Sequence, residues 1–133
     1  MREQNKVFHL AIPTHSIQES VNFYVHKLGC KLARQYDDRV TIDFFGDQIV
    51  CHLSPDEIDL KPKMYPRHFG VTFIEREEFE RLYRLAQSRE IQFYKDMFTR
   101  FKETPEEHSS FFLQDPSNNL LEFKYYSDPR MIY

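Results

Sequence analysis

The chain has 133 residues, of which 41% are hydrophobic and 16% aromatic, enough for one compact domain or for two half-domains that share a core. Its formal charge is only −3 and its charged residues occur in mixed order, which excludes a basic nucleic-acid surface and a polybasic membrane anchor. No apolar run approaches the roughly 18 residues that span a bilayer, and the polar segment 1–6 is unlike a signal peptide. We therefore expect a soluble cytoplasmic protein in which Cys30 and Cys51 are reduced thiols.

The first predicted element is a strand at 7–12, a short apolar run that ends at a proline. If its side chains alternate, His9 lies on the face opposite to most of the apolar ones. A helix is predicted next, because Ser16 and Glu19 form a capping box and Gly29 supplies a stop. Its apolar positions repeat at helical spacing, at Ile17, Val21, Tyr24, Val25 and Leu28.

The rest of the first half consists of short apolar runs separated by turn residues. On the last of these runs, His52 shares a face with Val50. Residues 55–66 contain three prolines and no sustained period, so we interpret them as a linker. The three runs are predicted strands at 30–36, 39–45 and 48–53.

The second half repeats this order. A strand headed by His68 precedes a helix at 75–89, whose apolar stripe follows acids in the first turn. The polar stretch 95–107 is predicted to be a long loop or an irregular strand, and 115–119 is rich in turn residues. The four predicted strands are at 67–74, 91–94, 108–114 and 120–126.

The chain is therefore predicted to be a single α+β domain built from two βαβββ modules. Module one spans about 7–54 and module two about 67–126, with the linker 55–66 between them. The repeat shows in the order of the elements, because sequence identity between the halves is slight. If the two mixed sheets curl toward each other, they form a cup that can hold a site.

Four possible metal ligands fall on the strand faces turned away from the predicted helices: His9, His52, His68 and Glu122. Imidazoles and a carboxylate suit a divalent ion such as Fe(II), Zn, Ni, Mn or Co. Two histidines and one carboxylate on one side of a metal leave positions open for substrate. The alternative is a hydrogen-bonded polar cluster without metal, in which Lys124 or an arginine pairs with Glu122.

Other polar residues are weaker candidates for a functional site than these four. His15 and His26 flank or sit on the first helix and are interpreted as surface residues. His108 opens a strand and could line the concave face. Arg100 and Lys102 could meet an anionic substrate, although solvated loop charges are the simpler interpretation.

The segments FHLAI at 8–12 and NFY at 22–24 before LGC at 28–30 resemble the opening of the vicinal-oxygen-chelate superfamily. That superfamily holds the glyoxalase I, bleomycin-resistance, fosfomycin-resistance and extradiol dioxygenase proteins. RHFGV at 67–71 resembles the start of its second module, and FLQDPSNNLLEF at 112–123 resembles its closing signature. The likeness covers nearly the whole chain.

The resemblance implies that each module supplies metal ligands from its first and last strands, here His9, His52, His68 and Glu122. Family members commonly have glycine where this chain has Asn118 or Asn119, and asparagine tolerates the same left-handed conformation. Glyoxalase-like members usually carry Glu or Gln where this chain has His52, so His52 is either an extra ligand or an acid–base group outside the metal shell.

The resemblance therefore implies a metal-dependent enzyme acting on a small oxygenated molecule, with Glu122 and His52 as its catalytic residues. Dioxygenase-like chemistry is favoured over glyoxalase I-type isomerisation because of His52, and Glu122 keeps isomerisation open. The rival is a non-catalytic binder like the bleomycin-resistance proteins, which hold an aromatic ligand between aromatic walls. A homodimer is expected on the same resemblance, with no nucleic-acid or membrane partner.

Overall fold

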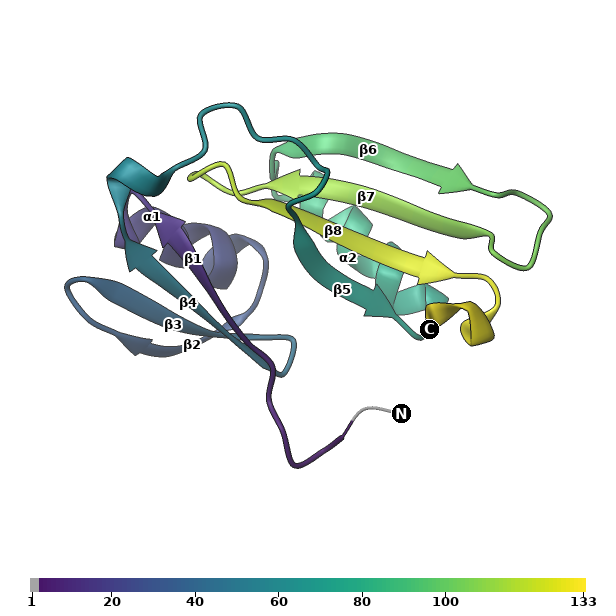
Figure 1. Cartoon of the computed structure of the whole chain (residues 1–133), viewed down its shortest axis with the longest axis horizontal. Coiled ribbons are helices and arrows are strands. Elements are labelled where there is room, and N and C mark those ends of the chain that lie inside the picture. Colours follow the sequence, from purple (N-terminus) through teal and green to yellow (C-terminus); the bar gives the residue numbers. More distant parts are fainter. Residues whose placement is uncertain (1–2) are drawn as a thin grey trace. The chain divides into compact units, whose positions relative to one another are not determined.

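The computed structural model describes residues 3–133, so Met1 and Arg2, which begin the polar segment discussed above, lie outside the described residues. The chain divides into two compact units with one four-stranded mixed sheet each (Figure 1). The predicted α+β class and the two βαβββ repeats are confirmed. A single domain, and the closing of both sheets around one site, stay predictions. Unit 1 comprises Met1–Leu60 and Pro116–Asn119, and unit 2 comprises Lys61–Asp115 and Leu120–Tyr133.

Unit 1 has the sheet order β1-β4-β3-β2, in which β1 and β4 are parallel and the other neighbours antiparallel. The predicted elements are all present, and the linker contains one short 3-10 turn, η2 at Pro55–Glu57. The elements are β1 (His9–Thr14), α1 (Ile17–Val21), η1 (Asn22–Lys27), β2 (Lys31–Gln35), β3 (Arg39–Phe44) and β4 (Asp47–Leu53).

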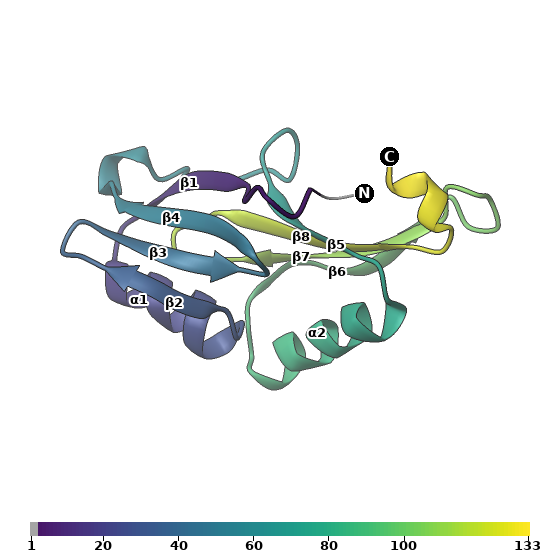
Figure 2. The ribbon, with the colours of Figure 1, turned by 90° about the horizontal axis from the view of Figure 1, so that it is seen from below.

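The helical segment of unit 1 begins as predicted, since Ser16 Oγ accepts a hydrogen bond from the Glu19 N–H. It then widens into the π-helical turn η1, in which the consecutive rings of Phe23 and Tyr24 are both buried. Gly29 follows with a φ of 87°, the left-handed stop expected of glycine. The helix packs on β3 and β4 (Figure 2).

Unit 2 has the corresponding sheet order β5-β8-β7-β6, with β5 and β8 parallel. Helix α2 covers one face of this sheet (Figure 2) through its buried side chains Phe79, Leu82 and Ala86. The elements are β5 (Phe69–Phe73), α2 (Arg76–Ser88), β6 (Phe93–Arg100), β7 (His108–Gln114), β8 (Leu120–Tyr126) and η3 (Pro129–Ile132).

The stretch 95–107 is in part an irregular strand, the second of the two forms predicted for it. β6 continues to Arg100, but its register against β7 shifts between Phe93 and Lys95 and again between Lys95 and Phe98. These irregularities break the simple alternation of apolar and polar residues, so the pattern alone marks only the start of the strand.

Cys30 and Cys51 are both buried in unit 1, and neither is in a disulfide. Burial raises the pKa of the Cys30 thiol to about 12, and the nearby Asp43 carboxylate adds to the shift. Among residues 3–133, no helix has both the length and the apolar character needed to cross a membrane.

Candidate metal-binding site

Unit 2 brings together two of the four predicted ligands. His68 Nε2 lies 3.1 Å from Glu122 Oε1. The Glu122 side chain is 10% exposed and that of His68 is 23% exposed, so the carboxylate is largely removed from water. Removing a carboxylate from water costs free energy unless a positive charge or hydrogen bonds stabilise it. His68 is placed to stabilise Glu122 in this way.

The parallel pairing of β5 and β8 creates this proximity. Gly70 pairs with Glu122, and His68 stands two residues before Gly70 on the same side of the chain. A Cβ atom at Gly70 would lie 1.6 Å from the Glu122 carbonyl oxygen, so a side chain there would force the two strands apart. Glycine at this position therefore permits the close approach of the two strands at the site.

The second ring nitrogen of His68 has a hydrogen-bond partner too. Nδ1 contacts the backbone carbonyl of Met64, which can only accept, so Nδ1 carries the proton of that bond. In the neutral ring, Nε2 then has only a lone pair, and this lone pair points at the Glu122 carboxylate. Two acceptors at 3.1 Å are stable together only with a cation or a proton between or beside them.

Lys124 supplies one such charge in this structure. Its Nζ lies 3.4 Å from Glu122 Oε1, which confirms the partner suggested by the strand pattern. Aromatic rings surround the pair: Phe112 and Tyr65 meet the His68 ring edge-on, at centroid distances of 5.2 and 5.8 Å. These ring contacts help to hold the imidazole in its orientation.

The donor atoms of this pair fit a divalent metal. Two ligands about 2.1 Å from one ion and about 90° apart are separated by about 3 Å, close to the 3.1 Å observed between Nε2 and Oε1. A carbonyl that holds Nδ1–H is the usual partner of a metal-ligating histidine. Residues 3–133 nevertheless show no group of three or more His, Cys, Asp or Glu side chains arranged to hold an ion, so metal binding by the full set stays a prediction.

In unit 1, His9 stands at the corresponding start of β1. Its Nδ1 lies 2.5 Å from Gln48 Oε1, the side chain of its cross-strand partner, and the residue is exposed. Since an amide oxygen only accepts, Nε2 of the neutral ring is again the free acceptor. His9 therefore has the same ligand form as His68, but its cross-strand contact is the amide of Gln48 instead of a carboxylate.

The register separates His52 from His9. His9 pairs with Gln48 and Pro13 pairs with His52, so four residues, roughly 13 Å of strand, divide the two histidines. The residue of unit 1 that corresponds to Glu122 is Val50, because Ala11, two residues after His9, pairs with Val50. His52 is exposed and lies two residues further along the same strand.

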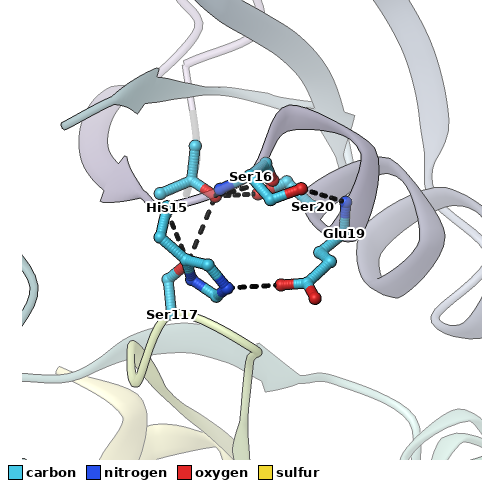
Figure 3. Close-up of polar contacts among 6 residues, drawn as sticks. His15, Ser16, Glu19, Ser20 and Ser117 are labelled. Atoms are coloured by element: carbon cyan, nitrogen blue, oxygen red, sulfur yellow. Dashed lines mark hydrogen bonds and ion pairs between the residues drawn. The ribbon is translucent and has the colours of Figure 1, made fainter. Parts of the chain in front are cut away.

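His15 is exposed, as the sequence pattern predicts, and it also takes part in a polar network in unit 1 (Figure 3). Its Nδ1 lies 2.8 Å from Ser117 Oγ, and its Nε2 lies 2.6 Å from Glu19 Oε2. The Ser117 hydroxyl also accepts the His15 backbone N–H at 3.0 Å and meets Thr14 Oγ1 at 3.2 Å.

This order of serine, histidine and carboxylate resembles a hydrolytic triad, but Ser117 is only 3% exposed and its oxygen is already surrounded by partners. The network instead holds the turn 116–119 against β1 and α1, together with the bond from Asn119 Nδ2 to the Pro13 carbonyl at 3.0 Å. No short sequence signal reveals it, since His15 and Ser117 are 102 residues apart.

The remaining candidates have local partners. His26 is exposed, and the half-buried His108 lies between the rings of Phe101 and Tyr126. Arg100 Nη2 donates to the Tyr65 hydroxyl at 3.2 Å, beside His68. Lys102 borders a different cavity, of about 250 Å³, which it shares with Arg76 at the start of α2.

The chain was compared with known proteins. The sequence model of the Glyoxalase/Bleomycin resistance protein/Dioxygenase superfamily matches residues 6–123. Comparison with the curated proteins gives no match.

Among solved structures, a glyoxalase/bleomycin resistance protein/dioxygenase from Alicyclobacillus acidocaldarius is 62% identical, with a TM-score of 0.96 and 100% coverage of both chains. The fosfomycin resistance protein FosX from Listeria monocytogenes is 12% identical, with a TM-score of 0.72, covering 96% of this chain and 98% of its own. A lactoylglutathione lyase from Agrobacterium tumefaciens is 13% identical, with a TM-score of 0.67, covering 93% and 96%. The last two likenesses concern the fold alone.

Proposed function

The chain belongs to the Glyoxalase/Bleomycin resistance protein/Dioxygenase superfamily, and from that premise we propose that it is a metal-dependent enzyme acting on a small oxygenated molecule. His68 and Glu122 are two of the proposed ligands. His9 is the third, supplied by unit 1 of the same chain or of a second copy. The ion is proposed to be Fe(II), Zn, Ni, Mn or Co, the divalent metals that such a set suits.

The proposal rests on two hydrogen-bond acceptors in unit 2 that face each other. The Met64 carbonyl fixes the His68 tautomer, so that the Nε2 lone pair faces the Glu122 carboxylate 3.1 Å away. A protonated imidazolium would satisfy the same two acceptors without metal, and metal analysis distinguishes the two states. This arrangement is what a divalent cation requires of two ligands.

The three-ligand set favours dioxygenase-like chemistry over glyoxalase-type isomerisation. A fourth protein ligand from unit 1 would stand at Val50, the position that corresponds to Glu122, and valine cannot bind an ion. When bound, the metal would hold vicinal oxygens of the substrate and stabilise the negative charge that develops on them. Because His52 lies two residues beyond Val50, we assign it an acid–base role outside the metal shell.

Two further parts of the proposal rest on composition and on the family. The buried free thiols suit a reducing cytoplasm. A homodimer is proposed because family members often pair modules between chains, and the molecular mass in solution tests it directly.

The deciding experiment is metal analysis of protein purified without added metal. We expect about one divalent ion per chain in the wild type and less than a tenth of that in His68→Ala and Glu122→Ala. His26→Ala, which removes an exposed histidine of unit 1, is the matched control and should retain its metal. If neither ligand substitution lowers the bound metal, the enzyme proposal fails and a metal-free binder takes its place.

A second measurement separates the two chemistries. Oxygen uptake with catechols is expected, whereas isomerisation of a thiol–methylglyoxal adduct is not. Isomerisation without oxygen uptake would reverse that assignment and leave the metal site intact.

A further inference from the structure

We propose that unit 2 binds a free α-amino acid with an apolar side chain, in the cavity of about 250 Å³ beside the first turn of α2. Glu107 binds the ammonium group of this ligand and Arg76 and Lys102 bind its carboxylate. Its side chain contacts Met97 and Tyr125, and all five residues border the cavity. The site goes beyond the proposed function, because it lies on the helix-covered side of the sheet and uses none of the proposed metal ligands.

The cavity lies where the side chains beneath α2 become small. The ring of Phe111 on β7 packs against Phe79 of α2, with centroids 5.4 Å apart, so the odd-numbered residues of β7 face the helix. Two residues earlier, Ser109 shares this face, and its cross-strand partner on β6 is Thr99. Both border the cavity, whose volume equals that of about eight water molecules at roughly 30 Å³ each. A free amino acid of medium size is a ligand of these dimensions.

The donors that line the cavity suit a carboxylate. The Arg76 side chain is 72% exposed, and among the described residues it is bonded through Nε, which donates to Glu80 Oε1 at 3.1 Å. Its terminal nitrogens and the exposed ammonium of Lys102 therefore retain N–H groups for a ligand. The hydroxyls of Thr99 and Ser109 lie 2.8 Å apart, so one donates to the other and the second keeps its proton for the same carboxylate.

Glu107 supplies the negative charge for an ammonium group. Its Oε1 accepts the Glu103 N–H at 2.9 Å, and its Oε2 accepts the Ser127 hydroxyl at 2.8 Å. These two hydrogen bonds lower the pKa of Glu107, and the positive charges of Arg76 and Lys102 add to the shift, so the carboxylate is ionised at neutral pH. Each of its oxygens keeps a further lone pair for a ligand N–H.

The balance of charge favours a zwitterion over an ion of one sign. The charged residues that border the cavity are two cations and two carboxylates: Arg76, Lys102, Glu80 and Glu107. A simple anion is attracted by the first two and repelled by the others, and a simple cation meets the opposite pattern. An α-amino acid carries both charges on one carbon atom, so it matches both signs at once.

The apolar part of the cavity selects the ligand side chain. Met97 and Tyr125 are both half-buried, so each still presents surface to the cavity. The ring of Tyr125 is held in place by stacking on Phe79 of α2, with centroids 6.2 Å apart and planes at 27°. Methionine adapts its shape to the group that it meets, so this wall suits a branched aliphatic side chain such as that of leucine.

The test uses ligand-observed NMR titrations of the full chain with three matched probes. L-Leucine carries both charges, 4-methylpentanoate is leucine without its ammonium group, and 3-methylbutylamine is leucine without its carboxylate. We expect leucine to bind at least tenfold more tightly than either analogue. Equal binding of 4-methylpentanoate would overturn the role of Glu107, and equal binding of 3-methylbutylamine would overturn that of Arg76 and Lys102. No saturable binding of leucine would overturn the site itself.

Matched variants locate the binding. Glu107→Gln should bring the affinity for leucine to within twofold of that for 4-methylpentanoate, a loss of selectivity that a merely structural role would not produce. Glu106→Gln, at the exposed preceding residue, is the control and should keep the tenfold preference. Arg76→Met should weaken leucine about tenfold, whereas Arg81→Met, at an exposed position of the same helix, should change it less than twofold. An unchanged preference in Glu107→Gln would overturn the assignment.

A last comparison separates this site from the proposed metal site. Treatment with EDTA and the substitution His68→Ala should each change leucine binding less than twofold, and loss of binding in His68→Ala would overturn the location. Leucine binding by a protein that never retains metal supports the amino-acid site and sinks the enzyme proposal. A protein that retains metal but does not bind leucine sinks the amino-acid site alone.

Discussion

The two units have the same order of elements and the same parallel pairing of first and last strands, yet the pairing brings a histidine against a carboxylate in unit 2 and against an amide in unit 1. In unit 2, His68 meets Glu122 across the β5–β8 pairing. In unit 1, His9 meets the amide of Gln48, and Val50 stands where the carboxylate would be. A repeated fold therefore does not imply a repeated site, because one side chain at one register position decides whether the pair exists.

The packing between strands differs in the same way. Ala11 and Gly70 occupy corresponding positions in the two units. Ala11 pairs with Val50, whereas Gly70 pairs with Glu122. Unit 1 accommodates a methyl group there, whereas in unit 2 a Cβ would lie 1.6 Å from the Glu122 carbonyl oxygen. The close approach of β5 and β8 beside the His68–Glu122 contact therefore depends on the missing side chain of Gly70.

The largest effect is expected from a substitution that gives unit 2 the same methyl group as unit 1 at this position. Gly70→Ala should lower the free energy of unfolding by about 3 kcal/mol, because β5 and β8 must separate to admit the methyl group. Denaturant titration measures the loss. The reverse change, Ala11→Gly, should cost only about 0.5–1 kcal/mol through chain entropy. Equal losses in the two variants would show that the strand approach is not special to unit 2.

The second prediction compares two histidines of unit 1, His9 and His52. His9→Asn should weaken the binding of the proposed metal about 100-fold, by removing a ligand, which corresponds to about 2.7 kcal/mol. His52→Asn should weaken it less than tenfold, since the register sets His52 roughly 13 Å along the strand from His9. Competition with a chromogenic chelator measures both affinities, and a loss at His52 as large as that at His9 would return His52 to the ligand set.

The third prediction compares one buried serine in each unit. Ser117→Ala should cost about 1 to 3 kcal/mol, because the His15 N–H, His15 Nδ1 and Thr14 Oγ1 all lose a partner. Ser110→Ala should be neutral or stabilising, since its hydroxyl has no partner among the described residues. Thermal unfolding of the two variants measures both changes in stability. A destabilised Ser110→Ala would show that the Ser110 hydroxyl has a hydrogen-bond partner in solution.

The last prediction is a pH dependence that belongs to unit 1 and has no effect at neutral pH. Burial raises the pKa of Cys30 from 9.0 to about 12, so the unfolded chain loses the thiol proton first. This contribution to stability is fully present below pH 9 and is lost as the pH rises toward 12, by up to about 1.4 kcal/mol per pH unit. Cys30→Ala should flatten the stability curve in that window, and identical slopes in wild type and variant would contradict the assignment.

Much of this architecture follows from local patterns. Short apolar runs, the Ser16–Glu19 capping box and the stop at Gly29 predict the elements of unit 1 close to their observed bounds, because these signals act within a few residues. β7 and β8 coincide with their predicted spans. The end of β6 does not, since two register shifts disturb the alternation on which the prediction depends.

Part of the candidate site is also predictable from local patterns, here from the alternation of side chains along a strand. Strand parity places Glu122 on the face away from α2 and indicates Lys124 as its partner, which the 3.4 Å contact confirms. Parity alone does not give the offset between paired strands. It puts His52 on the same face as Val50 but cannot tell which of the two corresponds to Glu122.

The sequence by itself thus determined the α+β class, the βαβββ repeat and the face on which each possible ligand lies, because periodicity and turn chemistry are local. Only the tertiary structure decided that Val50 corresponds to Glu122, that His68 Nδ1 contacts the Met64 carbonyl, and that His15 joins Ser117. It also decided that the buried hydroxyl of Ser110 has no partner within residues 3–133. These facts depend on strand register and on contacts between residues distant in sequence, which a single sequence does not encode in any short pattern.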